Sequence, residues 1–143
     1  MAIRDTSIKP FIQDRDENIF VGIDYPFHKS NGSEGWFKST STTIEAVKNN
    51  VRLLLRTERG ERLMQPNLGV ALKRFLFQQI DADTIIAMQN EIIDVMNFWL
   101  PFVEIKDIQV SADDSRNTIN INVTFNIIRD PNTLSSVQIE IGE

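Results

Sequence analysis

The sequence predicts an α+β fold in which helices pack on one face of a small antiparallel three-stranded C-terminal meander, preceded by a short N-terminal strand and an arm. Before Pro101, apolar residues recur at steps of three and four in two stretches, as on one face of an α-helix. After Pro101 the apolar period falls to two, which is typical of strands with one buried face. Polar turns separate these later apolar segments, as in a meander.

The size and composition fit one soluble domain at residues 19–143 with an N-terminal arm at residues 1–18. A net charge of −5 argues against a general nucleic-acid binder, which normally carries a basic surface. The chain has no cysteine and a single histidine, His28, so disulfides, thiolate chemistry and multi-histidine metal centres are excluded, and no cofactor is predicted. No apolar run reaches the about 18 residues that span a bilayer, and the first residues form no signal segment, so we expect neither membrane insertion nor Sec export.

The N-terminal region combines an arm, a strand and a flexible loop. Residues 1–18 alternate charges with isolated apolar side chains, which we interpret as a loosely attached arm. Residues 19–23 are rich in β-branched and aromatic side chains and predict a short strand. Residues 29–35 have the composition of a flexible loop, and Trp36 and Phe37 follow it. We expect these two aromatic side chains to cap the core rather than to contact a ligand.

The first helix begins after a run of Ser and Thr. Any of residues 41–43 could be its N-cap, and Thr42 and Glu45 have the spacing of a capping box. Its apolar stripe comprises Ile44, Val47, Val51, Leu54 and Leu55.

A second face of this helix carries four cations at steps of four, four and three, namely Lys48, Arg52, Arg56 and Arg59. This basic strip is either a solvated surface or a contact surface for an acidic partner. Because the chain as a whole is acidic, four cations along one helix edge are unusual, and the second interpretation stays open.

Residues 57–69 form the most distinctive run of the chain. Gly60 is expected to end the helix as its C′ residue, and Pro66 and Gly69 are expected to redirect the chain. Glu61 and Arg62 lie in the turn and have two interpretations. They either tie the turn to a helix end, with Arg62 reaching loop carbonyls, or form a fork that grips a partner carboxylate.

Two further helical segments follow. A short one is indicated by the spacing of Leu68, Leu72, Phe75 and Leu76. Either Asp81 or Asp83 caps a longer helix at residues 84–100, and Pro101 ends it. Its buried face is expected to comprise Ile85, Met88, Ile92, Met96 and Trp99, widened by Ile86, Ile93 and Leu100.

Three strands complete the chain. Residues 103–110 contain two alternating phases, which a bulge at residues 106–107 would reconcile. A polar hairpin loop at residues 111–117 leads to a strictly alternating strand at residues 119–127. After a turn at residues 130–132, the last strand is marked by Val137, Ile139 and Ile141.

The sequence offers little support for catalysis. It contains no P-loop, no dinucleotide fingerprint, no HExxH and no GxSxG. The remaining enzymatic interpretation is a two-carboxylate hydrolase that uses Glu58 and Glu61, joined by Glu104 or Asp107. The arginines on both sides of Glu61 would keep that carboxylate ionised, whereas a general acid needs a raised pKa.

The strongest indication of function is an ordered set around this loop: Leu54, Leu55, Thr57, Gly60, Glu61, Arg62, Leu63, Met64, Pro66 and Gly69. The set resembles the signature of the baseplate wedge and sheath-initiator family of contractile phage tails, whose members also occur in type VI secretion baseplates and are at times described as lysozyme-like. Residues 20–27 and 35–37 resemble the leader of many phage members. One departure is Leu100-Pro101-Phe102, where the family often has Glu-Pro-Arg, so a charged contact at this corner is not carried over.

The resemblance implies a non-enzymatic structural protein of the virion tail baseplate, assembled in the host cytoplasm. Its implied partners are the larger wedge subunits and the tail sheath protein, with tail tube and hub proteins as further candidates. Sheath initiation would use edge-strand addition to the last strand. Candidate partner-binding residues are Lys48, Arg52, Arg56, Arg59, Glu61, Arg62, Pro101, Phe102, Val137, Ile139 and Ile141. The alternatives are an acidic muramidase-like hydrolase of peptidoglycan and a stand-alone protein-binding adaptor.

Overall fold

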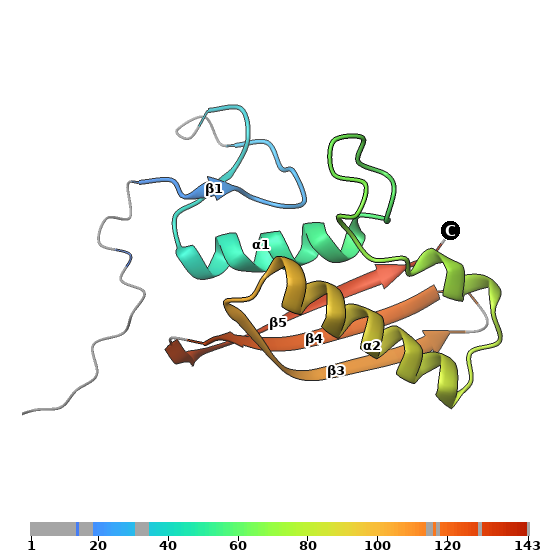
Figure 1. The fold of residues 1–143 in the computed structure, drawn as a ribbon. Coiled ribbons are helices and arrows are strands. Elements are labelled where there is room, and N and C mark those ends of the chain that lie inside the picture. Colours follow the sequence, from blue (N-terminus) through green and yellow to red (C-terminus); the bar gives the residue numbers. More distant parts are fainter. Residues whose placement is uncertain are drawn as a thin grey trace, which may run out of the picture.

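Helices cover one face of a three-stranded antiparallel sheet, and a small two-stranded hairpin lies beside the first helix (Figure 1). The computed structural model describes residues 14, 19–30, 35–113, 116, 118–128 and 130–142. This architecture confirms the predicted α+β fold. In the part of the chain that is described, no helix is long and apolar enough to cross a membrane.

The C-terminal sheet contains β3 (Val103–Asp113), β4 (Thr118–Ile127) and β5 (Asp130–Ile141) in the order β3-β4-β5. The predicted bulge is confirmed, because the register of β3 against β4 shifts between Ile105 and Asp107. The strict alternation of β4 places its odd-numbered side chains in the core. β3 continues to Asp113, so the polar loop is shorter than predicted.

Helix α1 (Thr43–Arg56) begins as the capping pattern indicates, because Thr42 Oγ1 accepts a 3.3 Å hydrogen bond from Glu45 N–H. The prediction that Gly60 ends this helix is wrong. The C-cap is Thr57, whose N–H and Oγ1 both donate to Leu53 O, at 2.9 and 2.6 Å. These two bonds complete the last helical turn, so Gly60 lies in the loop that follows.

A 3₁₀ helix, η1 (Lys73–Phe77), replaces the predicted short helix, and α2 (Ala82–Trp99) follows it. Asp81 caps α2 by accepting a 2.8 Å hydrogen bond from Thr84 N–H, so α2 begins two residues before the predicted start. The prediction that Ile86 is buried is wrong, and Val95 is buried instead. Ile86 is two residues from Met88 and points to the opposite side of the helix, whereas Val95 continues the stripe of Met88 and Ile92.

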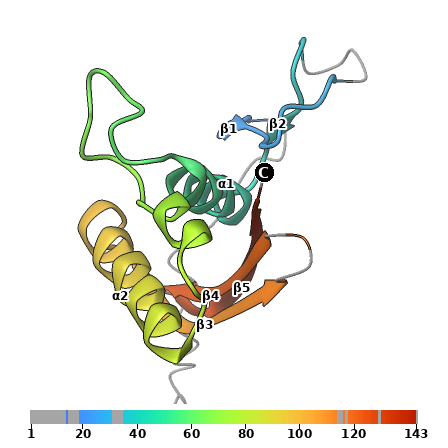
Figure 2. The same cartoon turned by 90° about the vertical axis from the view of Figure 1, so that its right-hand side faces the viewer.

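One hydrophobic core lies between the helices and the sheet, with α1 over β5 and α2 over β3 (Figure 2). Its fully buried side chains include Val51, Val70, Met88, Ile92, Met96, Ile119, Ile121, Val123, Phe125, Val137 and Ile139. Removing this apolar surface from water is the main contribution to stability.

The N-terminal hairpin (residues 19–30 and 35–40) pairs β1 (Gly22–Ile23) with β2 (Ser39–Thr40). β1 is shorter than the strand predicted at residues 19–23. The expectation that Trp36 and Phe37 cap the core is wrong, because they are 84% and 53% exposed. The predicted arm at residues 1–18 lies outside the described residues except for Asp14, whose carboxylate accepts hydrogen bonds from Thr43 N–H and Oγ1.

Candidate protein-interaction surfaces

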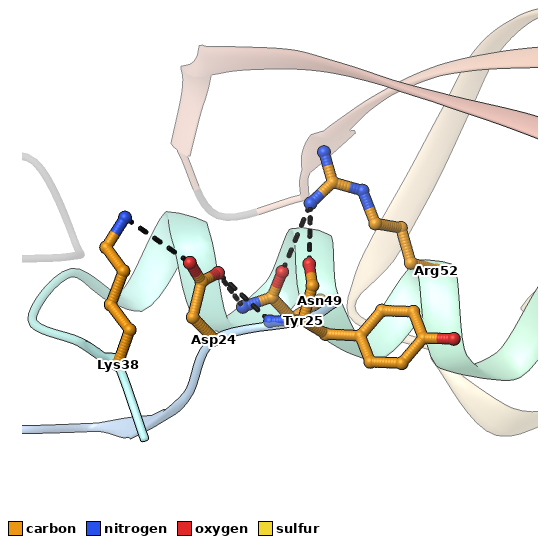
Figure 3. A network of polar contacts seen from close by, with 5 residues as sticks. All are labelled: Asp24, Tyr25, Lys38, Asn49 and Arg52. Carbon is orange, nitrogen blue, oxygen red and sulfur yellow. Dashed lines mark hydrogen bonds and ion pairs between the residues drawn. The ribbon is translucent and has the colours of Figure 1, made fainter. Parts of the chain in front are cut away.

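A network of five residues holds the N-terminal hairpin against α1 (Figure 3). Asp24 Oδ1 accepts hydrogen bonds from Asn49 Nδ2 at 3.2 Å and from Tyr25 N–H at 3.0 Å, and Asp24 Oδ2 lies 3.4 Å from Lys38 Nζ. Arg52 Nη1 donates to Tyr25 O at 3.2 Å and to Asn49 Oδ1 at 3.3 Å. Burial acts to raise the pKa of Asp24, but the hydrogen bonds from Asn49, Lys38 and Tyr25 N–H and the charge of Lys38 together outweigh it, so this pKa is lowered. We call these residues the hairpin network.

The prediction that all four cations of the basic strip lie on the first helix is wrong for Arg59, because α1 ends at Arg56 and Arg59 lies in the loop that follows. The strip is also not simply a solvated face. Arg52 belongs to the hairpin network, and Arg59 Nη2 lies 3.0 Å from Glu91 Oε1. The Arg56 guanidinium lies over the Tyr25 ring at 5.9 Å from its centroid. Lys48 is half-buried on the same edge. Partner binding by these four residues stays a prediction.

The run singled out in the sequence forms a closed loop, which we call the signature loop (residues 58–69). Val70 N–H donates to Thr57 O at 2.9 Å and closes its base, and Gly60 N–H donates to Pro66 O at 2.8 Å across it. Gly60 and Gly69 have φ of 90° and 109°, in the left-handed region that favours glycine. At Gly69 a Cβ atom would lie 2.2 Å from Thr57 O, so no other residue fits there without moving the backbone.

Glu61 and Arg62 differ in their surroundings. The Glu61 carboxylate accepts a 3.0 Å hydrogen bond from Glu58 N–H, and Glu61 N–H donates to Glu58 O at 3.1 Å, so Glu61 fixes the first turn of the loop. Arg62 is exposed, and its guanidinium has no ion pair or hydrogen bond among the described residues. Leu63 and Met64, which follow it, are 96% and 93% exposed.

Glu91 on α2 joins two arginines that the sequence does not obviously connect. Its carboxylate lies 3.0 Å from Arg59 Nη2 and 3.2 Å from Arg74 Nη2. The Glu91 side chain is largely buried, whereas both arginines are about half-exposed. Glu91 thus ties the start of the signature loop and η1 to the same turn of α2. The position of Glu91 in the helix gave little indication of these contacts, because a sequence does not distinguish a buried carboxylate from an exposed one.

The corner at Pro101 and Phe102 remains solvent-accessible. Phe102 is partly exposed, and Phe102 O accepts a 3.1 Å hydrogen bond from Ile128 N–H. Pro101 lies beside a groove of about 570 Å³ between α2 and β3, whose walls include Gln89, Ile93, Asn97, Ile108 and Ile128. A contact role for Pro101 and Phe102 stays a prediction.

The two free edges of the C-terminal sheet belong to β3 and β5, since β4 pairs with both. Ile128 N–H donates to Phe102 O on the β3 side, and Ile127 N–H donates to Thr133 Oγ1 at 3.1 Å on the β5 side. The N–H and C=O groups of successive residues in a strand point to opposite neighbours. Because Ile127 N–H points to the β5 side, the odd-numbered residues of β4 direct these groups toward β5. In the observed register, the odd-numbered residues from Ile119 to Phe125 meet Ile141, Ile139, Val137 and Ser135, and Ile127 meets Asp130.

It follows that the outward N–H and C=O groups of β5 belong to Ser136, Gln138 and Glu140. Val137 and Ile139 contribute core side chains rather than edge contacts, and Ile141 is half-buried. β3 differs because its edge is interrupted by the bulge and carries an ion pair between Lys106 Nζ and Glu104 Oε2 at 2.8 Å. Bulges and charges of this kind protect an edge from strand addition.

Three of the four carboxylates considered for hydrolysis, those of Glu61, Glu104 and Asp107, have structural contacts. Glu61 binds the Glu58 N–H, and Asp107 Oδ2 accepts a 2.9 Å hydrogen bond from Gln109 Nε2. The hydrogen bond from Lys106 lowers the pKa of Glu104, which is opposite to what a general acid requires. Within the described ranges, no group of three or more histidine and acidic residues could hold a metal ion.

Comparison with known proteins gives one family and several similar folds. A family model described as baseplate wedge protein gp25 matches residues 41–132, from just after β2 to within β5. No curated protein matches the chain. A "putative tail lysozyme" from Geobacter sulfurreducens is 24% identical with a TM-score of 0.63, over 72% of this chain and 93% of that chain.

Two similar chains come from assembled machines. One belongs to the anti-feeding prophage baseplate, with 22% identity and a TM-score of 0.55 over 82% of this chain and 81% of that chain. The other belongs to the type VI secretion baseplate complex, with 15% identity and a TM-score of 0.56 over 68% of this chain and 90% of that chain. At these identities the structural similarity shows a shared fold.

Proposed function

The chain belongs to the baseplate wedge protein gp25 family, and we propose that it is a wedge subunit of a contractile-tail baseplate that starts sheath assembly by strand addition at the free edge of β5. The proposed site of action is the tail baseplate, assembled in the host cytoplasm. The proposed partners are the tail sheath protein and the larger wedge subunits, with tube and hub proteins as further candidates.

The observation that carries this proposal is the outer edge of β5 from Ser135 to Ile141, where the register against β4 is unbroken; the register shift of this pair lies earlier in β5, opposite Phe125 and Ile127. Ser136, Gln138 and Glu140 direct their N–H and C=O groups away from β4, and their side chains are exposed. An extended arm of a neighbouring subunit could pair with these groups, and each new hydrogen bond contributes about 1 kcal/mol. The interrupted and charged edge of β3 is less suited to the same role.

We propose that this chain binds the larger wedge subunits through a surface other than the one that binds the sheath protein. Arg56 and Phe102 are exposed side chains of the basic strip and of the Pro101 corner. Arg56 makes no ion pair within the described part of the chain, so its charge is available to an acidic partner. These features support wedge contacts at both places.

The test of strand addition is a proline at an outward-facing position of β5. Gln138→Pro removes an N–H group that does not bond β4, and a proline at such an edge position is compatible with the sheet. Deleting the strand would be less informative because Val137 and Ile139 lie in the core. The matched control is Gln138→Ala, which shortens the same side chain but keeps the N–H.

We expect Gln138→Pro to lose binding to the purified sheath subunit by about tenfold or more, as when a central interface contact is removed. Gln138→Ala should bind like the unmodified chain. Circular dichroism should show that both variants are folded. Equal binding by a folded Gln138→Pro variant would refute strand addition at β5.

A further inference from the structure

We propose that the tip of the signature loop is a preformed apolar plug, which inserts Leu63 and Met64 into an apolar socket of a neighbouring subunit. The rim of this socket carries a carboxylate that pairs with Arg62. The inference rests on the assembly role proposed above, but it concerns a surface distinct from the edge of β5.

The first observation is the exposure of the tip. Leu63 and Met64 are adjacent and are 96% and 93% exposed, whereas side chains of this kind are usually buried. Both views show the loop extending away from the helices and the sheet (Figures 1 and 2). The apolar tip therefore makes no evident contribution to the core and is accessible to another protein.

The second observation is that the loop is already ordered by its own hydrogen bonds. Gln65 N–H donates to Arg62 O at 3.2 Å around the tip, and Leu68 N–H donates to Gln65 O at 3.0 Å. The Gly60 and Pro66 bond spans the loop below the tip. A segment fixed in its bound conformation loses little conformational entropy on association, so its apolar contacts contribute more fully to affinity.

The base of the loop is fixed to the body of the protein. Gly69 packs where a Cβ atom would meet Thr57 O, and Arg59 binds Glu91 on α2. A hollow of about 290 Å³ between the loop and α2 is lined in part by Phe98, which is 74% exposed. The rim of a socket that receives the tip can rest against this aromatic side chain and enlarge the apolar contact.

The charge of Arg62 indicates which group should lie at the rim of the socket. Arg59 is engaged with Glu91 and the Glu61 carboxylate with Glu58 N–H, so Arg62 is the cation beside the tip whose guanidinium has no partner among the described residues. An arginine pairs most favourably with a carboxylate through two parallel hydrogen bonds. The fitting partner is thus a protein surface with an apolar pocket and an Asp or Glu at its edge.

The test uses the full chain, tagged and produced in cells that assemble tails, and measures its incorporation per purified tail particle. We expect the double variant Leu63→Ser/Met64→Ser to be incorporated about tenfold less, because buried anchors dominate interface energy. Phe77→Ser, which also removes an exposed apolar side chain, should be incorporated normally. Wild-type incorporation of the double variant would overturn the proposal.

Two measurements separate this inference from strand addition. The double variant should bind the purified sheath subunit normally, whereas Gln138→Pro should not. A photo-crosslinking amino acid at position 63 should label a peptide of another tail protein that contains apolar residues and an Asp or Glu. Arg62→Glu should reduce incorporation more than Arg62→Gln. Labelling of a peptide without acidic residues, or equal incorporation of the two Arg62 variants, would refute the carboxylate rim.

Discussion

The C-terminal unit, made of the helices and the three-stranded sheet, buries its apolar side chains, whereas the N-terminal hairpin exposes most of its own. In the unit, side chains from α1, α2 and all three strands form one buried cluster. In the hairpin, the large apolar side chains stay substantially exposed, namely Ile19, Phe20, Val21, Ile23, Phe27, Trp36 and Phe37. The hairpin is held instead by the hairpin network of polar contacts with α1.

The two regions therefore contribute unequally to stability. Burial of apolar surface contributes about 25 cal/mol for each Å², so the unit should set the free energy of global unfolding. The hairpin depends on a few half-exposed hydrogen bonds, and a two-stranded hairpin alone is marginally stable in water. We therefore expect it to open at a lower free energy than the rest of the chain.

Truncating a core side chain of the unit should change the free energy of unfolding the most. Phe125 on the central strand is fully buried, and Phe125→Ala should lower the free energy of global unfolding by about 3–5 kcal/mol through lost burial and a cavity. Urea denaturation followed by circular dichroism measures the change. Phe77→Ala, at an exposed position, should change it by less than about 0.5 kcal/mol. Similar losses in both variants would contradict a single core in the unit.

Much of the unit could be predicted because local patterns and tertiary packing agree there. The alternation in β4 and the change of period at Pro101 both follow from one buried face per element. The N-cap at Asp81 and the bulge near Lys106 have local sequence signals. The misplaced helix end at Gly60 arose because Thr57 caps α1 with its own hydroxyl, an alternative that the glycine pattern does not reveal.

The candidate surfaces were harder to predict because they depend on which groups meet in three dimensions. The spacing located Arg52 and Arg59, but not their partners, the Tyr25 carbonyl and Glu91. Trp36 and Phe37 have the composition of core residues, and only the docking of the hairpin leaves them exposed. The exposure of Leu63 and Met64 likewise follows from the hydrogen bonds that close the signature loop.

A smaller and local effect is expected when the hairpin network is broken. Arg52→Ala removes the donor to Tyr25 O and Asn49 Oδ1, and it should weaken hairpin docking by about 1–2 kcal/mol. Hydrogen exchange at Val21 N–H and Asp24 N–H, which bond to Thr40 O and Lys38 O, reports the opening. Amides of β4 should keep their protection. Equal loss of protection in β4 would show that the hairpin and the unit unfold together.

The smallest effect expected is the acid sensitivity of hairpin docking. The folded-state pKa of Asp24 lies below its ordinary value of 3.8, since burial disfavours the ionised carboxylate less than Asn49, Lys38 and Tyr25 N–H together favour it. A lowered pKa adds stability that is fully present above pH 3.8 and is lost as the pH falls through the folded-state value. Exchange at Val21 and Asp24 should therefore accelerate, relative to β4, as the pH is lowered below 3.8. Asp24→Asn should remove this dependence, and acid sensitivity that persists in Asp24→Asn would assign it to another carboxylate.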